Sequence, residues 1–177
     1  LKNKEKLSNL SSEKNDELIK DISNQIISLG GKPNIDQSDQ KLLIKNLTKQ
    51  LDTLLVKSIL NDKTKNKIKD EEINGIKIRL QNVDGLPPKE LRKLVDNGKK
   101  DLGEGIVVVF ASKDDKVGVA VGITVKLAEK YDAVKFVKLS SEIIGGQGGG
   151  GRKDFAQAGG QDKSKINEAF KKIKSLI

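Results

Sequence analysis

The stretch that decides the fold of this chain is residues 143–160, which read IIGGQGGGGRKDFAQAGG. This glycine segment contains eight of the seventeen glycines of the chain, and apolar residues flank the run on both sides, at 143–144 and 155–156. Flexible linkers are instead flanked by Ser, Pro and polar residues. We therefore expect both ends of the glycine segment to be anchored in a hydrophobic core.

Two nucleotide-binding motifs are excluded in the glycine segment, and a third interpretation remains. A P-loop would require a Gly-Lys-Ser/Thr sequence, which does not follow here. A dinucleotide fingerprint would open a helix after a strand, whereas these glycines follow a predicted helix over 132–144. Glycines also let the main chain approach a phosphate or ribose closely, and Arg152 can bind phosphate with two bonds or stack on a base. This pattern favours a backbone cradle for nucleic acid, with Arg152 and Lys153 at its rim.

The segment also resembles a family motif. Gly-Gly-x-Gly-Gly-Gly followed by Arg-x-Asp-x-Ala-Gln-Ala-Gly-Gly is similar to the C-terminal motif of bacterial alanyl-tRNA synthetases, in a domain of the DHH-associated family. Asp154 and residues 156–160 match the synthetase version, while the related phosphoesterases carry a His that this chain lacks. Four glycines stand where three are common, and Lys153 stands where Pro is frequent. The similarity extends upstream over nearly the whole chain.

The resemblance implies a non-catalytic part of a larger ligase. In that family, upstream domains use ATP, Mg and a Zn ion to charge tRNA(Ala) and to edit mischarged tRNA, and the C-terminal domain holds the outer corner of the tRNA. We expect no cofactor in this chain, and expect tRNA(Ala), the upstream domains and a homodimer partner as its partners. The absence of an initial Met likewise predicts a fragment of a longer protein.

The residues predicted to bind tRNA lie in the glycine segment. Asp154 is expected to brace the loop by accepting backbone N–H bonds, and Gln157 either braces the loop or contacts a nucleotide. The lysines of the tail, at 163, 165, 171, 172 and 174, either extend this surface or form a solvated helix face. The predicted tRNA-binding residues are Gly145, Gly146, Gly148, Gly149, Gly150, Gly151, Arg152, Lys153, Gln157, Gly159 and Gly160.

The amino-acid composition limits the kinds of catalytic and metal sites that this chain can form. The 177 residues include 34 Lys plus Arg against 25 Asp plus Glu, a net charge of +9, and contain no Cys, His, Met or Trp. These zeros exclude disulfides, a thiol nucleophile, an imidazole base and a Cys/His zinc site, so we expect no catalytic residue and no metal site. A phosphoesterase would need clustered Asp and His ligands. With no apolar run of about 18 residues and no signal core, we expect a cytoplasmic protein without membrane contact.

Residues 1–71 are predicted to form a helical subdomain. Apolar residues recur at helical spacing up to a stop at Gly30, and again from Leu43 to Ile59 after a capping sequence at 36–39. A short turn between the helices would give an antiparallel helical hairpin. The hairpin is either a simple packed pair or a self-association module. Residues 61–72 are predicted to be a fraying helix end or a linker.

Residues 72–177 are predicted to form a globular α/β subdomain. The apolar residues change to a period of two over 73–80, which predicts a strand. A helix is predicted after Pro87-Pro88. The apolar run 106–111 is typical of a strand buried on both faces. The strand partner at 117–123 is followed by the helix 132–144, the Gly-rich loop, a strand and a basic amphipathic helix over 162–177. The predicted fold class is therefore mixed α+β: the helical hairpin followed by a small mixed sheet in the order β-α-β-β-α-loop-β-α.

Overall fold

The computed structural model describes the backbone of residues 2–177 and the side chains of residues 11–177. The chain divides into two compact units, a helical unit up to Ser58 and a globular unit from Ile59 to Ile177. The division lies thirteen residues before the predicted boundary at 71/72, which falls inside strand β1 (Asn66–Ile73). The linker predicted over 61–72 is therefore wrong for residues 66–72. Its charged residues hid a strand because an edge strand can carry charges on both faces.

The helical unit has its helix ends where the sequence predicts them. Helix α1 (Lys2–Ser28) ends in a turn in which Gly30, at φ 79°, donates its N–H to the Ile27 carbonyl at 2.9 Å. Helix α2 (Gln40–Asn61) begins after Asp39, whose Oδ1 accepts the N–H of Lys41 at 2.9 Å. The stop at Gly30 and the cap within 36–39 are both confirmed.

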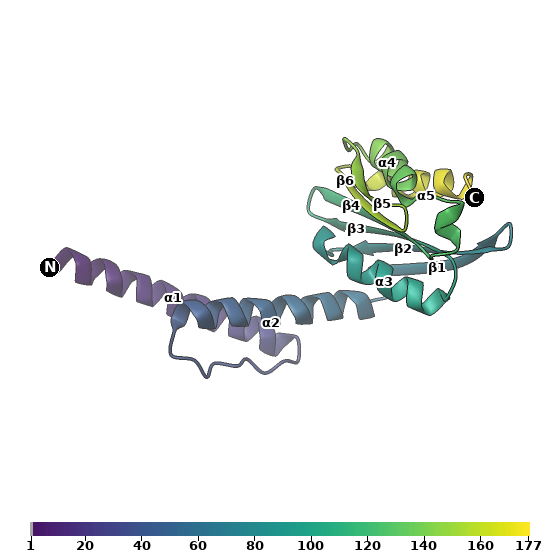
Figure 1. Ribbon diagram of the computed structural model, residues 1–177. Coiled ribbons are helices and arrows are strands. Elements are labelled where there is room, and N and C mark those ends of the chain that lie inside the picture. The colour runs from purple at the N-terminus through teal and green to yellow at the C-terminus, as the bar shows by residue number, and fades with distance from the viewer. Residues whose placement is uncertain (1) are drawn as a thin grey trace. The chain divides into compact units, whose positions relative to one another are not determined.

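The direction of the two helices differs from the prediction. Gln40, at the start of α2, donates to Asp16 in the middle of α1 at 2.7 Å, and Leu54, near the end of α2, lies against Gly31 just beyond α1. The helices therefore run parallel (Figure 1), and the predicted antiparallel hairpin is wrong. The reason is the connection, which is not a short turn: residues 29–39 are long enough, at about 3.3 Å per extended residue, to return along the helices.

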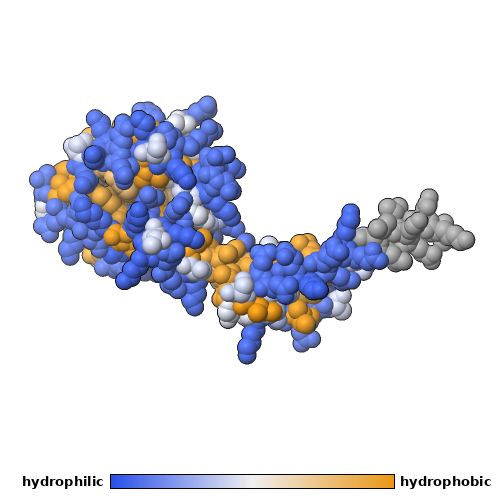
Figure 2. Space-filling view, turned by 180° about the vertical axis from the view of Figure 1, so that it is seen from behind, coloured by the Kyte–Doolittle hydropathy of each residue, from blue (hydrophilic) through white to orange (hydrophobic). Residues whose placement is uncertain are grey.

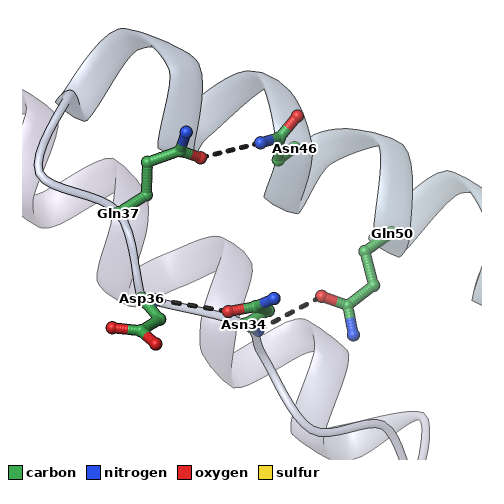
Figure 3. A pocket seen from close by; sticks show the side chains of 5 residues that line it. All are labelled: Asn34, Asp36, Gln37, Asn46 and Gln50. Carbon is green, nitrogen blue, oxygen red and sulfur yellow. Dashed lines mark hydrogen bonds between the residues drawn. The ribbon is translucent and has the colours of Figure 1, made fainter.

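Side-chain amides of α2 hold this return segment in place (Figure 3). Gln50 Nε2 donates to the Lys32 carbonyl at 2.7 Å, and its Oε1 accepts the N–H of Asn34 at 3.4 Å. Asn46 Nδ2 donates to Gln37 Oε1 at 2.8 Å. These bonds replace water on an extended segment that has no β-strand neighbour, so the polar face of α2 is committed to its own loop.

The apolar face of α2 forms the core of the helical unit. The predicted stripe is buried at Leu43, Leu47 and Leu51, and it packs against Ile22 and Ile26 of α1. Leu55, predicted to belong to the same stripe, is 38% exposed. The seam is thus shorter than the sequence period implied.

The globular unit is built on one six-stranded mixed sheet of order β1-β2-β3-β4-β6-β5 (Figure 1). Strands β2 and β3 pair in parallel, and all other neighbours pair antiparallel. The mixed class is confirmed, but the predicted element order lacks the two edge strands, β1 and β5. The remaining strands are β2 (Ile76–Asp84), β3 (Ile106–Lys113), β4 (Lys116–Ile123), β5 (Gly149–Arg152) and β6 (Phe155–Gly160).

Helices cover both faces of the sheet, and β4 shows why. Its larger residues, such as Val119 and Val121, face a core shared with α4 and α5, while Gly118 and Gly122 on the other face lie against α3. The small residues let α3 approach closely, and the valines fill the thicker layer. The helices are α3 (Leu91–Leu102), α4 (Ala133–Ile143) and α5 (Ile166–Lys174), with short 3₁₀ turns at Pro88–Glu90, Leu127–Glu129 and Lys163–Lys165.

Candidate nucleic-acid interface

The glycine segment forms a β-hairpin where the sequence predicted a loop. Strand β5 pairs with β6 from Gly149 opposite Ala158 to Arg152 opposite Phe155, and Lys153-Asp154 form the turn. The hairpin closes one side of the sheet, with β5 as the edge strand. Both ends of the segment are anchored as expected, because Ile144 and Ala156 are completely buried.

The hairpin separates the predicted binding residues into two groups. Gly145, Gly146 and Gly148 lie between α4 and the start of β5, whereas Arg152 and Lys153 lie at its far end. Gly148 and Arg152 are four positions apart along an extended segment, a distance of about 13 Å. The structure does not bring these groups together in a single cradle.

A buried serine holds the glycines nearest α4. The Ser141 hydroxyl donates to the Gly159 carbonyl at 2.7 Å and accepts the N–H of Gly148 at 3.1 Å, and the Ser141 carbonyl accepts the N–H of Gly146 at 2.7 Å. The sequence prediction missed this residue. The sequence did contain an indication of it: Ser141 comes four residues after Val137 and so lies on the buried face of a helix, where a hydroxyl requires a hydrogen-bond partner.

Most of the glycines in the segment are required by the fold. A Cβ on Gly146 would lie 1.8 Å from the Gly159 carbonyl oxygen, and a Cβ on Gly149 would lie 2.3 Å from the Ala158 Cβ. Gly151 and Gly160 are equally crowded, by the backbone of β6 and of Ile144. Gly145 and Gly148 adopt φ of 74° and 103°, which favour glycine. The fold alone therefore accounts for glycine at these positions, and no ligand is needed to explain them.

Gly150 and Gly159 have no such requirement. A Cβ on Gly150 would have no atom within 4 Å, and a Cβ on Gly159 would make only an ordinary contact of 3.6 Å with the Val117 carbonyl. Neither residue has a positive φ. The fold would accept a side chain at both positions, so their glycines need another explanation.

Both of these glycines lie on the same face of the sheet. In β6, Ala156 and Ala158 pack toward α4, so the alternation of the strand places the intervening residues on the α3 side. Residues directly opposite in β5 share that face. We call this surface the glycine strip. Its residues, exposed except for half-buried Phe155, are Gly150, Arg152, Phe155, Gln157 and Gly159.

Arg152 is held at one end of the strip by a carboxylate. Its Nε donates to Asp154 Oδ1 at 3.1 Å and its terminal nitrogen donates to Oδ2 at 3.4 Å, while the Arg152 side chain stays 71% exposed. Asp154 was expected to accept backbone N–H bonds, but the bonds its carboxylate accepts here come from Arg152. The carboxylate orients the guanidinium, which has further N–H donors for an outside acceptor.

The tail lysines lie apart from the strip. They are carried by α5 and the turn before it, and α5 packs in the core on the other face of the sheet. Lys174 pairs with Glu71 at 3.1 Å and Lys165 pairs with Glu168 at 3.2 Å. The structure therefore places Gly150, Arg152, Gln157 and Gly159 of the predicted residues along one face of the sheet, with Arg152 and Gly159 at opposite ends of the strip, and it leaves the lysines on a different surface.

Comparison with known proteins identifies the fold of the globular unit. A family model described as the DHHA1 domain matches residues 75–177, more than half of the chain. The chain belongs to the DHHA1 domain family. In the C-Ala domain of Aquifex aeolicus alanyl-tRNA synthetase, a solved structure 29% identical, the same fold is superposed with a TM-score of 0.57 over 61% of this chain and 96% of that one.

Curated relatives of this DHHA1 domain are alanine–tRNA ligases. Those of Hyphomonas neptunium and Parvibaculum lavamentivorans are 47% and 44% identical over 107 and 108 residues, which are 60% of this chain and 12% of each relative. The resemblance to the C-terminal domain of alanyl-tRNA synthetases is confirmed. The family model begins at residue 75 and does not include the helical unit. Among the described helices, none is both long and apolar enough to span a membrane.

Proposed function

We propose that the chain is a tRNA-binding part of an alanine–tRNA ligase, and that the globular unit binds tRNA(Ala) through the glycine strip. The similarity to alanine–tRNA ligases supports the parent enzyme, and the net charge of +9 suits a polyanionic partner. Catalysis, with its ATP, Mg and Zn ions, is assigned to other domains of the parent enzyme. A cytoplasmic location goes with that role.

The observation that carries the proposal is the pair of glycines without a folding requirement. Gly150 and Gly159 leave main chain uncovered on an exposed sheet face that carries Arg152 at one end. A ribose or phosphate can approach such a surface to van der Waals distance, and an arginine at its end can neutralise the phosphate. A tRNA corner offers mainly phosphates, 2′-hydroxyls and a few exposed bases, which suits recognition by shape and charge.

Two substitutions test the strip on the full chain. We expect Arg152→Ala to weaken binding of transcribed tRNA(Ala) by about 1–3 kcal/mol, because a charge-assisted contact is lost. We expect Gly150→Ala to weaken binding without lowering the melting temperature, because its methyl group occupies only the ligand's space. Fluorescence anisotropy over a salt series measures both, and wild-type affinity should fall steeply as salt rises.

The matched control is Lys172→Ala, an exposed lysine of α5 on the other face of the sheet. It removes the same charge as Arg152→Ala, and we expect a smaller loss of affinity. Wild-type affinity of both strip variants at low salt, with the fold intact, would remove the strip from the interface.

Self-association of the helical unit is a second candidate function. Between residues 11 and 177, five of the eight exposed large hydrophobic residues belong to this unit of 58 residues: Leu18, Ile27, Ile35, Leu42 and Leu55. Apolar patches are visible on it in Figure 2. We expect light scattering over a concentration series to show a dimer that Leu42→Glu dissociates. A wild-type monomer at the highest concentration would refute this role.

A further inference from the structure

The three arginines of this lysine-rich chain mark places where a planar guanidinium is used. Arg79 donates to both carboxylate oxygens of Asp70, at 2.7 and 2.8 Å, and to Asp101 at 2.7 Å. A lysine ammonium could not reproduce that fork. The chain has 34 Lys plus Arg residues, and the other two arginines, Arg92 and Arg152, both lie next to Phe155.

Arg92 approaches Phe155 from helix α3. Its guanidinium carbon lies 5.1 Å from the centroid of the Phe155 ring, within the range of a cation–π contact. Arg152 stands directly opposite Phe155 in the hairpin register. One guanidinium therefore lies over the Phe155 ring, and a second arginine stands opposite that residue on the same face of the hairpin.

The Arg92 guanidinium retains its hydrogen-bonding capacity. Arg92 is exposed, and within the described part of the chain no carboxylate pairs with it, in contrast to Arg79 and Arg152. Resting a guanidinium on an aromatic ring fixes its plane without using its N–H donors. Its outer face and its donors are both available to a ligand.

We propose that Arg92, supported by Phe155, is a stacking site for an exposed nucleobase of the bound RNA. This inference rests on the proposed function and deepens it, because it adds base recognition on α3 to backbone contact along the strip. The RNA backbone follows the strip from Gly159 past Gly150, and a base at the Phe155 end stacks on the Arg92 plane. Guanidinium planes and aromatic rings are the groups on which proteins stack unpaired bases.

The test compares substitutions that separate charge from planarity. Arg92→Ala removes both, whereas Arg92→Lys keeps the charge and loses the plane. We expect both variants to bind transcribed tRNA(Ala) about tenfold more weakly, as for the loss of one stacked base. Lys93→Ala, an exposed neighbour on the same helix, is the matched control and should change affinity less than twofold.

A second readout reports stacking directly. A short RNA hairpin carrying a single unpaired 2-aminopurine should be quenched by the wild-type chain and by Lys93→Ala, but not by Arg92→Lys. Phe155→Leu keeps an apolar group beneath Arg92 and should lose quenching in part. Thermal melting of each variant shows that the fold persists.

The outcomes distinguish this inference from the function on which it rests. Wild-type affinity in Arg92→Ala, or full rescue by Arg92→Lys, would overturn the stacking site. If Arg152→Ala alone weakens binding, the strip binds RNA and the inference about Arg92 fails. Absence of tRNA binding by the wild-type chain at low salt overturns the proposed function and this inference together.

Discussion

The two edges of the sheet are opposites. Strand β1 has eight residues, five of them charged, while β5 has four residues, of which three are glycines. Three of the five charges of β1 are paired within the unit: Asp70 pairs with Arg79, and Glu71 pairs with Lys69 and Lys174. Charge and shortness are both ways in which proteins keep edges from pairing with other chains. Both edges leave alternate backbone groups unpaired, but in β5 three of the four residues have no side chain to cover them.

The bare edge has a defined hydrogen-bonding direction. The Ile123 N–H donates to the Asp154 carbonyl at 2.8 Å, so by alternation Phe155 and Gln157 bond toward β5, where Arg152 and Gly150 stand opposite. The N–H and C=O groups of the intervening glycines at 149 and 151 therefore point away from the sheet. The comparison shows that charged side chains protect the β1 edge, whereas the β5 edge exposes backbone N–H and C=O groups.

The largest expected effect on stability is at Gly146, which lies between α4 and β5. We expect Gly146→Ala to destabilise the globular unit by about 3 kcal/mol or more, because the new methyl group would meet the Gly159 carbonyl and the Ser141 hydroxyl. Urea unfolding measures the change. A loss below about 1 kcal/mol would show that the glycines near α4 are not required by packing.

At the charged edge, the expected effect is smaller. We expect Arg79→Ala to cost about 1–3 kcal/mol, because the arginine is mostly buried while its partners Asp70 and Asp101 remain near solvent. Arg79→Lys should recover only part of this loss, since it cannot form the fork with Asp70. Equal stability of Arg79→Ala and the wild type would mean that the ion pairs of this edge contribute nothing.

Acid should affect the charged edge before the glycine edge. A hydrogen bond from Arg79 lowers the pKa of Asp70, and hydrogen bonds from Lys69 and Lys174 lower the pKa of Glu71. Carboxylates with a lowered pKa in the folded state add stability above their unfolded pKa, near 4, and this stability is lost as the pH falls through the folded value. We expect the melting temperature to drop below pH 4 and Arg79→Ala to flatten that drop by roughly 2–5 °C. An unchanged slope in the variant would contradict the assignment.

The smallest expected effect on stability is at Gly150 in the bare strand. Gly150→Ala meets no neighbouring atom, and alanine costs less chain entropy than glycine, so stability should stay within about 0.5 kcal/mol of the wild type or rise slightly. The contrast with Gly146→Ala is the sharpest form of the comparison, because the same methyl group is added twice within five residues. A large loss at Gly150 would show that the open edge is a packed one.

Local signals in the sequence predicted the elements whose causes are local. The stop at Gly30, the cap before α2 and the buried run of β3 depend on neighbouring residues, and the structure has them where they were expected. Strand β1 was missed because its apolar residues are few and its pairing with β2 is not visible locally. The parallel course of α1 and α2 depends on a return segment whose partners in α2, Asn46 and Gln50, come 9 to 18 residues later.

The candidate site was predictable in composition but not in arrangement. The glycine segment and Arg152 were identified from sequence, yet only the β5–β6 register shows that Gly150 and Gly159 share a face and that Gly146 does not contribute to it. Arg92 was missed for the same reason. It is 63 residues before Phe155, and nothing in its own helix indicates that the ring lies beneath it.

The parallel course of the helical unit has a mechanical consequence. A hairpin would return the chain to the level at which it entered, whereas here each helix carries the chain the same way and the return segment alone runs back. The two helices therefore add their lengths in one direction, and α1 alone, with 27 residues, advances the chain by about 40 Å. Gln50 and Asn46 hold the return segment to α2 by hydrogen bonds, while the buried leucines hold α2 to α1.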